Sequence, residues 1–341
     1  MGLLDIKPNK VKADLLDYKI AIYGQAKSGK TTLVYDLVDK KYDGDLSKML
    51  LLATERGYNA LDGVYARDIS SWAEFKKVVK ELIDNKEKYP FKILAIDTVD
   101  KLEEYATDYT IKAMSRNDKK KYVTIGDAPY GAGYAFLESE VSDTLDKLDK
   151  AGYTLWYITH DKDKTFKTED GVEFNKTDLS LGSKVKGIVT NDVDFIFYIK
   201  NESHMNASGG VDVERYIYLR DNGNLVAGSR FSDMPEKIKY STEGLLETVE
   251  GAILSKYGGS QEKVEEAKQE QQEEAEEKAT EEVISEQSAS ELHKEISEII
   301  KTKEKSEIAL VSEKLKEAYD TANYTKIDDV DTLLEIKELV K

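Results

Sequence analysis

A glycine-bounded segment near the N-terminus has the residue types that proteins use to hold phosphate groups. The stretch "GQAKSGKT" fits the spacing G-x-x-x-x-G-K-[ST] and lies between a strand-like apolar run and a helical pattern. Its glycines let backbone N–H groups curl round phosphates, and the helix adds its positive N-terminal end. Lys30 is expected to reach the outer phosphates of ATP, and the Thr31 hydroxyl is expected to bind Mg²⁺. The expected nucleotide contacts are Gly24, Gln25, Ala26, Lys27, Ser28, Gly29, Lys30, Thr31 and Thr32.

Two carboxylates follow apolar runs downstream of this loop. Asp97 ends "ILAID" and is expected to hold Mg²⁺ through water, although it would also suit the cap of a helix beginning at "DTVDKL". Glu55 follows "LLLAT" and would project from the carboxyl end of a strand, where open parallel sheets place ligands. A carboxylate there can polarise the water that attacks a terminal phosphate. On the residues alone, a surface ion pair with Arg56 is the simpler interpretation of Glu55.

Two polar stretches combine basic and aromatic residues. Lysines attract nucleic-acid phosphates whatever the base sequence, and aromatic rings can stack on bases. In 115–133 the candidates are Arg116, Lys119, Lys120, Lys121 and Tyr130, and in 161–182 they are Lys162, Lys164 and Lys167. Acidic residues are mixed into the second stretch, which has no clear periodicity. Two solvated surface loops explain these residues about as well as a DNA-binding surface does.

The rest of the chain up to about residue 258 alternates strand-like and helix-like patterns. Apolar runs predict strands at 18–24, 48–54, 91–97 and 153–160. Helical spacing predicts helices at 29–40, 71–90, 98–114 and 134–152. The alternation predicts an α/β fold with a mostly parallel sheet covered on both faces. Two further strands, "VDFIFYIK" and "ERYIYLRDN", are expected to form an antiparallel pair with a loose connection.

Charge is distributed unevenly along the 341 residues. The net charge is −17, and 261–290 alone contains eleven Glu and three Lys, a net of −8. The acidic balance argues against a globally basic nucleic-acid binder but leaves a local basic surface open. We predict an ATPase core at 1–258, an acidic low-complexity linker or exposed helix at 259–290, and a small helical module at 291–341.

Composition excludes several classes of site. The chain has no cysteine and three histidines far apart, so a cysteine nucleophile is excluded and a zinc site is not expected. No apolar run approaches the ~18 residues needed to span a bilayer. We therefore expect a cytoplasmic protein without a membrane anchor.

Several segments, in order, resemble RecA-family recombinases over roughly 18–230. They are "LLATERGYNAL", "ILAIDTVDKL", "IGDAPYGAGYAFLESEVSDTLDKL", "TLWYITH" and "GSKVKGIVTNDVDFIFYI". More closely, the chain is similar to compact RecA-like P-loop ATPases of bacteriophages, AAA-type nucleotide-binding proteins of which some act in single-strand annealing and recombination. The resemblance implies a RecA-like core and assigns the family's catalytic glutamate to Glu55.

The same resemblance implies roles for other residues. The two polar stretches correspond to loops that face DNA. His160 stands where recombinases usually have an amide side chain that senses the terminal phosphate, and an imidazole can also donate a hydrogen bond there. Arg215 and Arg220 lie near lysines that reach the neighbouring subunit's nucleotide. Arg220 is the better candidate because it ends its predicted strand.

These inferences predict a Mg²⁺-dependent ATPase that acts on single-stranded DNA in phage-type recombination or annealing. The resemblance further implies a homo-oligomer, either filament or ring, in a bacterial host's cytoplasm, and a single-strand-binding protein as a partner. The alternative is a nucleotide-gated switch or loader that a protein partner activates. A small-molecule phosphotransferase ranks last, because "SRNDKKKYVTIGD" offers a single arginine for a phosphate-binding lid.

Overall fold

The protein divides into two compact units, Met1–Val264 and Glu265–Lys341. The computed structural model describes residues 10–167, 170, 171, 173–301, 308, 312, 313, 315, 316, 324–327 and 330–340. The division of the chain at 258 and 290 stays a prediction.

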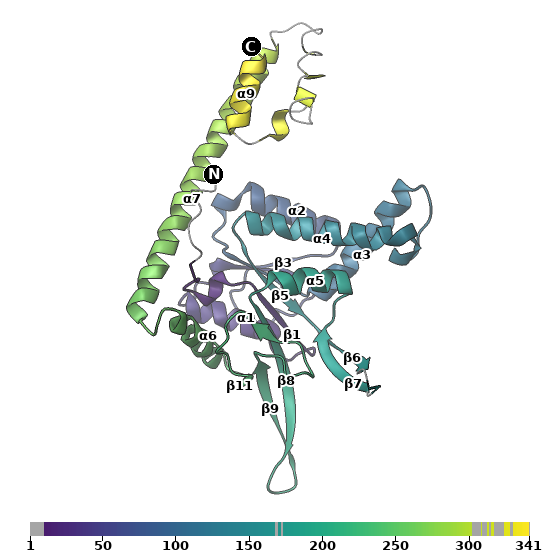
Figure 1. Ribbon diagram of the computed structural model, residues 1–341, viewed down its shortest axis with the longest axis vertical. Helices are drawn as coiled ribbons and strands as arrows, with labels where there is room; N and C mark the ends of the chain where they lie inside the picture. Colours follow the sequence, from purple (N-terminus) through teal and green to yellow (C-terminus); the bar gives the residue numbers. More distant parts are fainter. Residues whose placement is uncertain are drawn as a thin grey trace. The chain divides into compact units, whose positions relative to one another are not determined.

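A nine-stranded sheet forms the centre of the first unit (Figure 1). Its order is β11 (Lys237–Lys239), β9 (Val211–Tyr218), β8 (Phe195–Met205), β1 (Ile20–Gly24), β5 (Thr154–Thr159), β4 (Ile93–Asp97), β2 (Met49–Ala53) and β3 (Ala66–Asp68), with β10 (Gly228–Ser229) paired to β8. The strands from β8 to β3 pair in parallel, whereas β9, β10 and β11 pair antiparallel. The predicted α/β fold with a mostly parallel sheet is confirmed.

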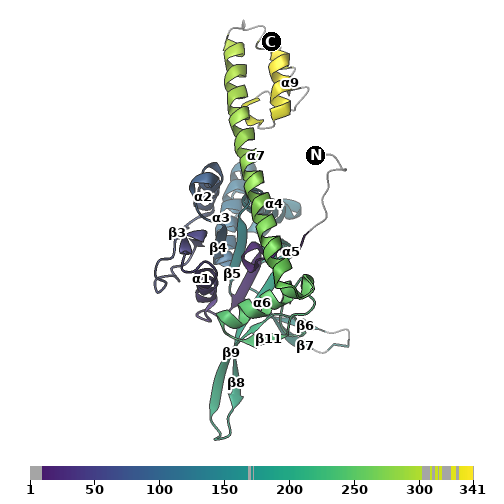
Figure 2. The same ribbon diagram turned by 90° about the vertical axis from the view of Figure 1, so that its left-hand side faces the viewer.

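Helices cover both faces of this sheet (Figures 1 and 2). One face packs against α2 (Trp72–Asp84), α3 (Val99–Asn117), α4 (Ala132–Lys150) and α5 (Ser183–Asp192). The other packs against α1 (Lys30–Lys41) and α6 (Thr242–Lys256). Short 3-10 turns occur at Leu15–Asp17, Leu46–Lys48, Lys86–Lys88, Ile125–Asp127 and Pro129–Gly131.

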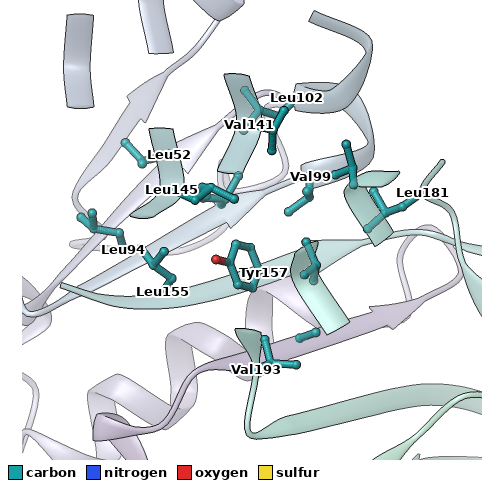
Figure 3. Packing of buried hydrophobic residues seen from close by; sticks show 14 of the residues in the cluster. Leu52, Leu94, Val99, Leu102, Val141, Leu145, Leu155, Tyr157, Leu181 and Val193 are labelled. Carbon is teal, nitrogen blue, oxygen red and sulfur yellow. The ribbon is translucent and has the colours of Figure 1, made fainter. Parts of the chain in front are cut away.

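Strand alternation sorts the core into two layers. Successive side chains of a strand point to opposite faces. Leu155 and Tyr157 of β5 therefore pack with α2 to α5, whereas Trp156 and Ile158 pack with α1 and α6. Figure 3 shows Tyr157 at the centre of the first layer, beside Leu155 and Leu145. Burial on both faces explains why these strands read as nearly continuous apolar runs.

Helix α2 shows how local sequence sets an element's bounds. Ser71 is its N-cap, and its hydroxyl accepts a hydrogen bond from the Glu74 N–H at 3.2 Å. Apolar residues then recur at helical spacing, and Trp72, Phe75 and Val79 are buried. The helix ends at Asp84, before the turn at Lys86–Lys88 that precedes β4.

The polar stretch 161–182 contains a hairpin rather than an irregular loop. Strands β6 (Asp161–Lys167) and β7 (Glu173–Leu179) pair antiparallel in a sheet of their own. Phe166 and Phe174 stack across it with ring centroids 5.8 Å apart. Polar residues occupy most of both faces, so no apolar alternation marks these strands in the sequence.

The β8–β9 hairpin is also longer than the sequence predicts. Its strands continue through most of the expected loose connection, so that Met205 pairs with Val211. The turn is closed by Asn206, whose Oδ1 accepts hydrogen bonds from the N–H groups of Ser208 and Gly210. This hairpin projects well beyond the sheet (Figures 1 and 2).

The second unit has a small helical core. The boundary between the units falls within α7 (Gln261–Lys301), and the other helix of the second unit whose bounds are established is α9 (Val330–Val340), after a 3-10 turn at Tyr324–Lys326. Among the described residues, this core contains the buried side chains of Leu292, Ile296, Leu315, Leu333 and Ile336. Most of 302–323, within the predicted C-terminal module, lies outside the described residues. Among the described residues, no helix is long and apolar enough to cross a membrane.

A buried carboxylate fastens the β6–β7 hairpin to α5. The Asp178 side chain is 2% exposed, and its Oδ2 accepts hydrogen bonds from Lys164 at 2.9 Å and Lys186 at 2.7 Å. Burial alone would raise the pKa of Asp178, but the bonds from Lys186 and Lys164 outweigh it and hold the pKa below its usual value. The ionised form is therefore the one that the fold stabilises.

Replacing Asp178 with Asn should destabilise the protein by about 2 kcal/mol at neutral pH, because two charge-assisted hydrogen bonds lose their charge. A carboxyl with a depressed folded-state pKa contributes stability above its unfolded value of about 3.9, and loses it as pH falls through the lower folded value. The difference in unfolding free energy between wild type and Asp178→Asn should therefore become smaller below about pH 4. Urea unfolding across pH measures this, with the exposed Asp163→Asn of the same hairpin as control. If this difference in unfolding free energy did not change with pH, Asp178 would not be the ionised partner of Lys164 and Lys186.

Candidate nucleotide-binding site

Parallel pairing brings the predicted site residues to one edge of the sheet. Strands β1, β2, β4 and β5 run in the same direction, so their carboxyl ends lie together. Gly24 ends β1 and Asp97 ends β4, Glu55 follows β2 after one residue, and His160 follows β5 directly. Open parallel sheets bind ligands at this edge.

The loop between β1 and α1 wraps round the Lys30 ammonium group. The buried Lys30 Nζ donates hydrogen bonds to the carbonyl oxygens of Gly24 and Gln25, each at 2.9 Å. Burial lowers the pKa of Lys30, while the charge of Asp97 opposes that shift. A Cβ at Gly24 would lie 2.5 Å from the Ile199 carbonyl oxygen, so only glycine fits where the loop begins.

Other loop residues divide into exposed and buried groups. Gln25, Ala26 and Lys27 are exposed, and Lys27 has a positive φ of 62° that is uncommon outside glycine. The Ser28 side chain is buried, and its hydroxyl has no hydrogen-bond partner among the described residues. Native structures rarely leave a buried hydroxyl unpaired, so Ser28 marks a place where a ligand atom can complete the site. Thr32 is exposed on the first turn of α1.

Thr31 and Asp97 bring two side-chain oxygen atoms together. The Thr31 hydroxyl donates a hydrogen bond of 2.6 Å to Asp97 Oδ2. Burial raises the pKa of Asp97, while the bond from Thr31 and the charge of Lys30 act against that shift. Thr98, not Asp97, is the N-cap residue of α3. Asp97 is thus directed to the phosphate loop rather than to the helix that follows.

Glu55 lies beside this pair. A Cβ at Gly57 would be 3.8 Å from both Thr31 Oγ1 and Asp97 Oδ2, which places the segment after β2 against them. Glu55 itself is exposed, and its negative charge acts on the pKa values of Lys30, Asp97 and His160. Arg56 forms its ion pair with Asp68, at 3.7 Å, and not with Glu55 as the simpler interpretation of the sequence expected.

His160 is held by Asp100 on the first turn of α3. The His160 Nδ1 lies 2.9 Å from Asp100 Oδ2, and the His160 N–H donates to Asp100 Oδ1 at 3.3 Å. Thr159 also donates to Asp100 Oδ1 at 3.0 Å. The hydrogen bond that His160 makes to the Asp100 carboxylate raises the pKa of His160, although burial opposes this shift. Asp100 therefore fixes the junction between β5 and β6, with the imidazole at the nucleotide edge.

The two candidate arginines lie at different levels of the sheet, since Arg215 is within β9 and Arg220 is two residues beyond its carboxyl end. Arg215 pairs with Asn201 beyond the point where β8 passes Gly24, and therefore lies at the edge with the phosphate loop. Arg220 lies past the carboxyl end of the strand, where its Nη1 donates to the Met234 carbonyl at 3.4 Å. The structure thus brings Arg215, and not Arg220, to the loop of its own chain. A role for Arg220 in a neighbouring subunit's site stays a prediction.

The predicted DNA-binding residues form two groups at different distances from the loop. Helix α3 begins at Val99 beside Asp97, and Arg116 near its far end lies about 26 Å further along the helix axis. Lys119, Lys120, Lys121 and Tyr130 follow Arg116, and all are exposed. The β6–β7 hairpin instead begins directly after His160. Its three lysines have partners within the chain: Lys162 donates to the Leu181 carbonyl, Lys164 binds Asp178, and Lys167 lies 3.8 Å from Glu173.

Two residues at this site lie outside the sequence prediction. Asp100 follows Asp97 by three residues, and this spacing in "DTVD" was an available signal for a second carboxylate at the same edge. Tyr240 follows β11, and its hydroxyl donates a hydrogen bond of 2.9 Å to the Gly29 carbonyl. No local pattern marks Tyr240, because the contact joins residues 211 positions apart.

These groups fit a nucleotide with a divalent cation. The loop provides a lysine and a buried unpaired hydroxyl, which suit phosphate oxygens. Thr31 and Asp97 provide a hydroxyl and one carboxylate, and Mg²⁺ is commonly bound by one or two protein oxygens together with substrate phosphates. In the part of the chain that the structure describes, no cluster of three or more His, Cys, Asp or Glu could hold a metal by itself. Phosphate oxygens would thus complete the Mg²⁺ site.

Comparison with known proteins agrees with this geometry. A protein-family model described as an AAA domain matches residues 16–231, which include the loop, Glu55, Asp97, His160 and both arginines. The SPbeta prophage-derived uncharacterized protein YorG of Bacillus subtilis (strain 168) is 29% identical over 252 residues, covering 71% of each chain. The match to the AAA domain spans more than half of the sequence. The chain therefore belongs to the AAA-domain family of P-loop ATPases, which bind and hydrolyse nucleotides.

Proposed function

We propose that this protein is a Mg²⁺-dependent ATPase that acts on single-stranded DNA in phage-type recombination or strand annealing. The observation that carries the enzymatic part is the convergence of Lys30, Thr31, Asp97 and Glu55 at one edge of the sheet. Phosphate binding, metal binding and activation of water each need one of these groups. Asp97 ends β4, Glu55 follows the adjacent strand β2, and Lys30 and Thr31 begin helix α1 after β1.

Each residue has a chemical role in this proposal. Lys30 exchanges its two carbonyl partners for the outer phosphates of ATP, whose negative charge restores the ammonium form that burial disfavours. Thr31 and Asp97 would hold Mg²⁺, which supplies positive charge to the phosphate oxygens when it is bound. Glu55 is exposed beside them and accepts a proton from the attacking water. His160 is poised by Asp100 to donate a hydrogen bond to the terminal phosphate.

The DNA part of the proposal has separate support. Tyr130 is fully exposed and has a positive φ of 55°, and three exposed lysines precede it in the same connection. Exposed aromatic and basic side chains together suit a strand whose bases are unpaired. The relative from Bacillus subtilis is described as prophage-derived, which supports a role in phage biology. A single-strand-binding protein as a further partner rests on the resemblance alone.

Assembly into an oligomer has its own support in the β8–β9 hairpin. Met205, Val211 and Val213 are 83%, 66% and 62% exposed, and they share one face because Met205 pairs with Val211. An isolated two-stranded hairpin is marginally stable in water, and exposed apolar patches mark interaction sites. The hairpin continues from the strand beside the phosphate loop, so a neighbouring subunit that covered it would lie near the nucleotide.

One observation favours the alternative of an ATPase that a protein partner activates. Lys162 and Lys164 of the β6–β7 hairpin are engaged by the Leu181 carbonyl and Asp178, so their donors are not free for phosphates. The chain's net charge of −17 also weakens attraction to DNA. In that case hydrolysis would respond to a protein and not to DNA.

The Glu55→Gln substitution tests the proposed general base. The amide keeps the size of the side chain but cannot accept the proton, so turnover should fall by about 100-fold or more. ATP binding should stay within a few-fold of wild type because Lys30 and the loop are unchanged. Fluorescence titration and phosphate release measure the two quantities. Turnover at the wild-type rate would remove Glu55 from the mechanism.

The DNA assignment is tested by ATP hydrolysis with and without single-stranded DNA, with Lys30→Ala as the blank. We expect stimulation of about tenfold or more, since each tenfold change needs only about 1.4 kcal/mol of added transition-state stabilisation. If the rate of ATP hydrolysis were the same with and without single-stranded DNA, this part of the proposal would be rejected. The same assay with host-cell protein fractions would then test the partner-activated alternative.

The basic connection is tested by replacing Lys119, Lys120 and Lys121 with Ala together. Loss of three phosphate contacts should weaken single-strand binding and reduce the slope of log K against log salt by about 2. Fluorescence anisotropy at several salt concentrations measures both. A matched variant replaces the exposed Lys77, Lys147 and Lys150 of α2 and α4, which removes the same charge from another surface. Equal effects of the two variants would mean that only net charge matters.

A further inference from the structure

The base of the β8–β9 hairpin places one arginine against the phosphate loop. In the strand register Gly24 pairs with Ile199, Ile199 with Ile217, and Asn201 with Arg215. Residues two apart on a strand share a face. Arg215 therefore lies on the same face as Ile217, which packs in the layer between the sheet and helices α1 and α6.

Tyr240 joins Arg215 to the loop. The Tyr240 N–H donates to the Arg215 carbonyl at 2.8 Å, and the Arg215 guanidinium lies over the Tyr240 ring, 5.0 Å from its centroid. The Tyr240 hydroxyl donates to the Gly29 carbonyl at 2.9 Å. A Cβ at Gly29, where φ is 96°, would lie 2.8 Å from that hydroxyl and 3.0 Å from Arg215 Nη1. Gly29 thus lets the tyrosine and the arginine approach the loop together.

The charge of Arg215 has no carboxylate partner here. Its Nε donates to the Asn201 side-chain oxygen at 3.2 Å, and no ion pair joins it to any carboxylate that the structure describes. Lys237 and Lys239 of the neighbouring strand differ in this respect, because they bind Glu202 and Glu214. An exposed guanidinium without a counter-ion is unusual in a chain of net charge −17, and it lies at the loop where phosphates are expected.

We propose that Arg215 contacts the phosphates of the nucleotide bound by its own subunit, and that Tyr240 positions both Arg215 and the phosphate loop. This inference rests on the proposed nucleotide site. A guanidinium presents several N–H donors in a plane and stacks on aromatic rings, which a lysine ammonium cannot reproduce. The contact differs from the role expected from the sequence, in which an arginine reaches the neighbouring subunit's nucleotide.

Binding of the fluorescent analogue mant-ATP to the full-length protein tests the contact. The Arg215→Ala variant should bind about 10- to 100-fold more weakly, the range for a hydrogen bond to a charged group. Arg215→Lys should recover only part of the affinity, because the charge remains and the stacked plane is lost. The control is Lys200→Ala, which removes a positive charge from the opposite face of the same hairpin and should bind as wild type does.

These outcomes separate the inference from the proposed function. If wild type and Lys200→Ala both fail to bind mant-ATP, the nucleotide site itself is wrong. If both bind, and Arg215→Ala with a wild-type circular dichroism spectrum binds equally well, the contact by Arg215 is rejected while the site stands. Tyr240→Phe should keep the stacked ring but lose the bond to Gly29, and should give a smaller loss than Arg215→Ala.

Mixing two defective variants distinguishes a contact within one subunit from a contact between subunits. In an equimolar mixture of Arg215→Ala and Lys30→Ala, every subunit lacks one group of its own site. We therefore expect no more ATP hydrolysis than the sum of the separate variants. Recovery of hydrolysis in the mixture would mean that the Lys30→Ala subunit supplies its Arg215 to a neighbour, and would overturn the proposal.

Discussion

Parallel pairing of β1, β2, β4 and β5 is the constraint on which the site depends. Each strand is buried on both faces, and the register between them is fixed by the layers of side chains that pack under α2 to α5 and against α1 and α6. A slip of one residue would exchange the two faces of a strand. The core thus determines where each strand ends, and the strand ends determine where Thr31, Asp97, Glu55 and His160 meet.

Two buried charges at the carboxyl edge of the sheet, those of Lys30 and Asp97, lack a fully charged partner in the part of the protein that the structure describes. Burial lowers the pKa of Lys30 and raises that of Asp97, so each charged form is disfavoured where it stands. The lysine uses two carbonyl oxygens as partners, and the aspartate uses the Thr31 hydroxyl. In the proposed complex, a polyphosphate would supply the negative charge that Lys30 lacks, and a divalent cation would supply the positive charge that Asp97 lacks. The same fold can therefore release its internal hydrogen bonds in exchange for stronger charge-assisted ones.

The sequence was sufficient where the signal is local. The phosphate loop, the apolar strands and Asp97 can be predicted because spacing and burial are visible within a few residues. The position of Arg215 beside the phosphate loop of its own chain illustrates what is not local. The carboxyl end of a strand is the ligand edge only for parallel strands, and β9 runs antiparallel to β8, so its amino end lies there. Likewise the β6–β7 hairpin has polar residues on both faces, so hydrophobic periodicity does not predict its strands.

The first turns of α3 provide the physical link between the nucleotide edge and the β6–β7 hairpin. Asp97 ends the strand before α3 and accepts a hydrogen bond from Thr31. Asp100, on the first turn of α3, holds His160 where β6 begins. After a further turn Glu103 accepts hydrogen bonds from the Gly182 N–H, at 2.9 and 3.1 Å, where α5 begins after β7. Both ends of the hairpin segment are thus tied to the same helix that starts at the metal-binding aspartate of the proposal. A displacement of the first turns of α3 would therefore act on both ends of the hairpin segment.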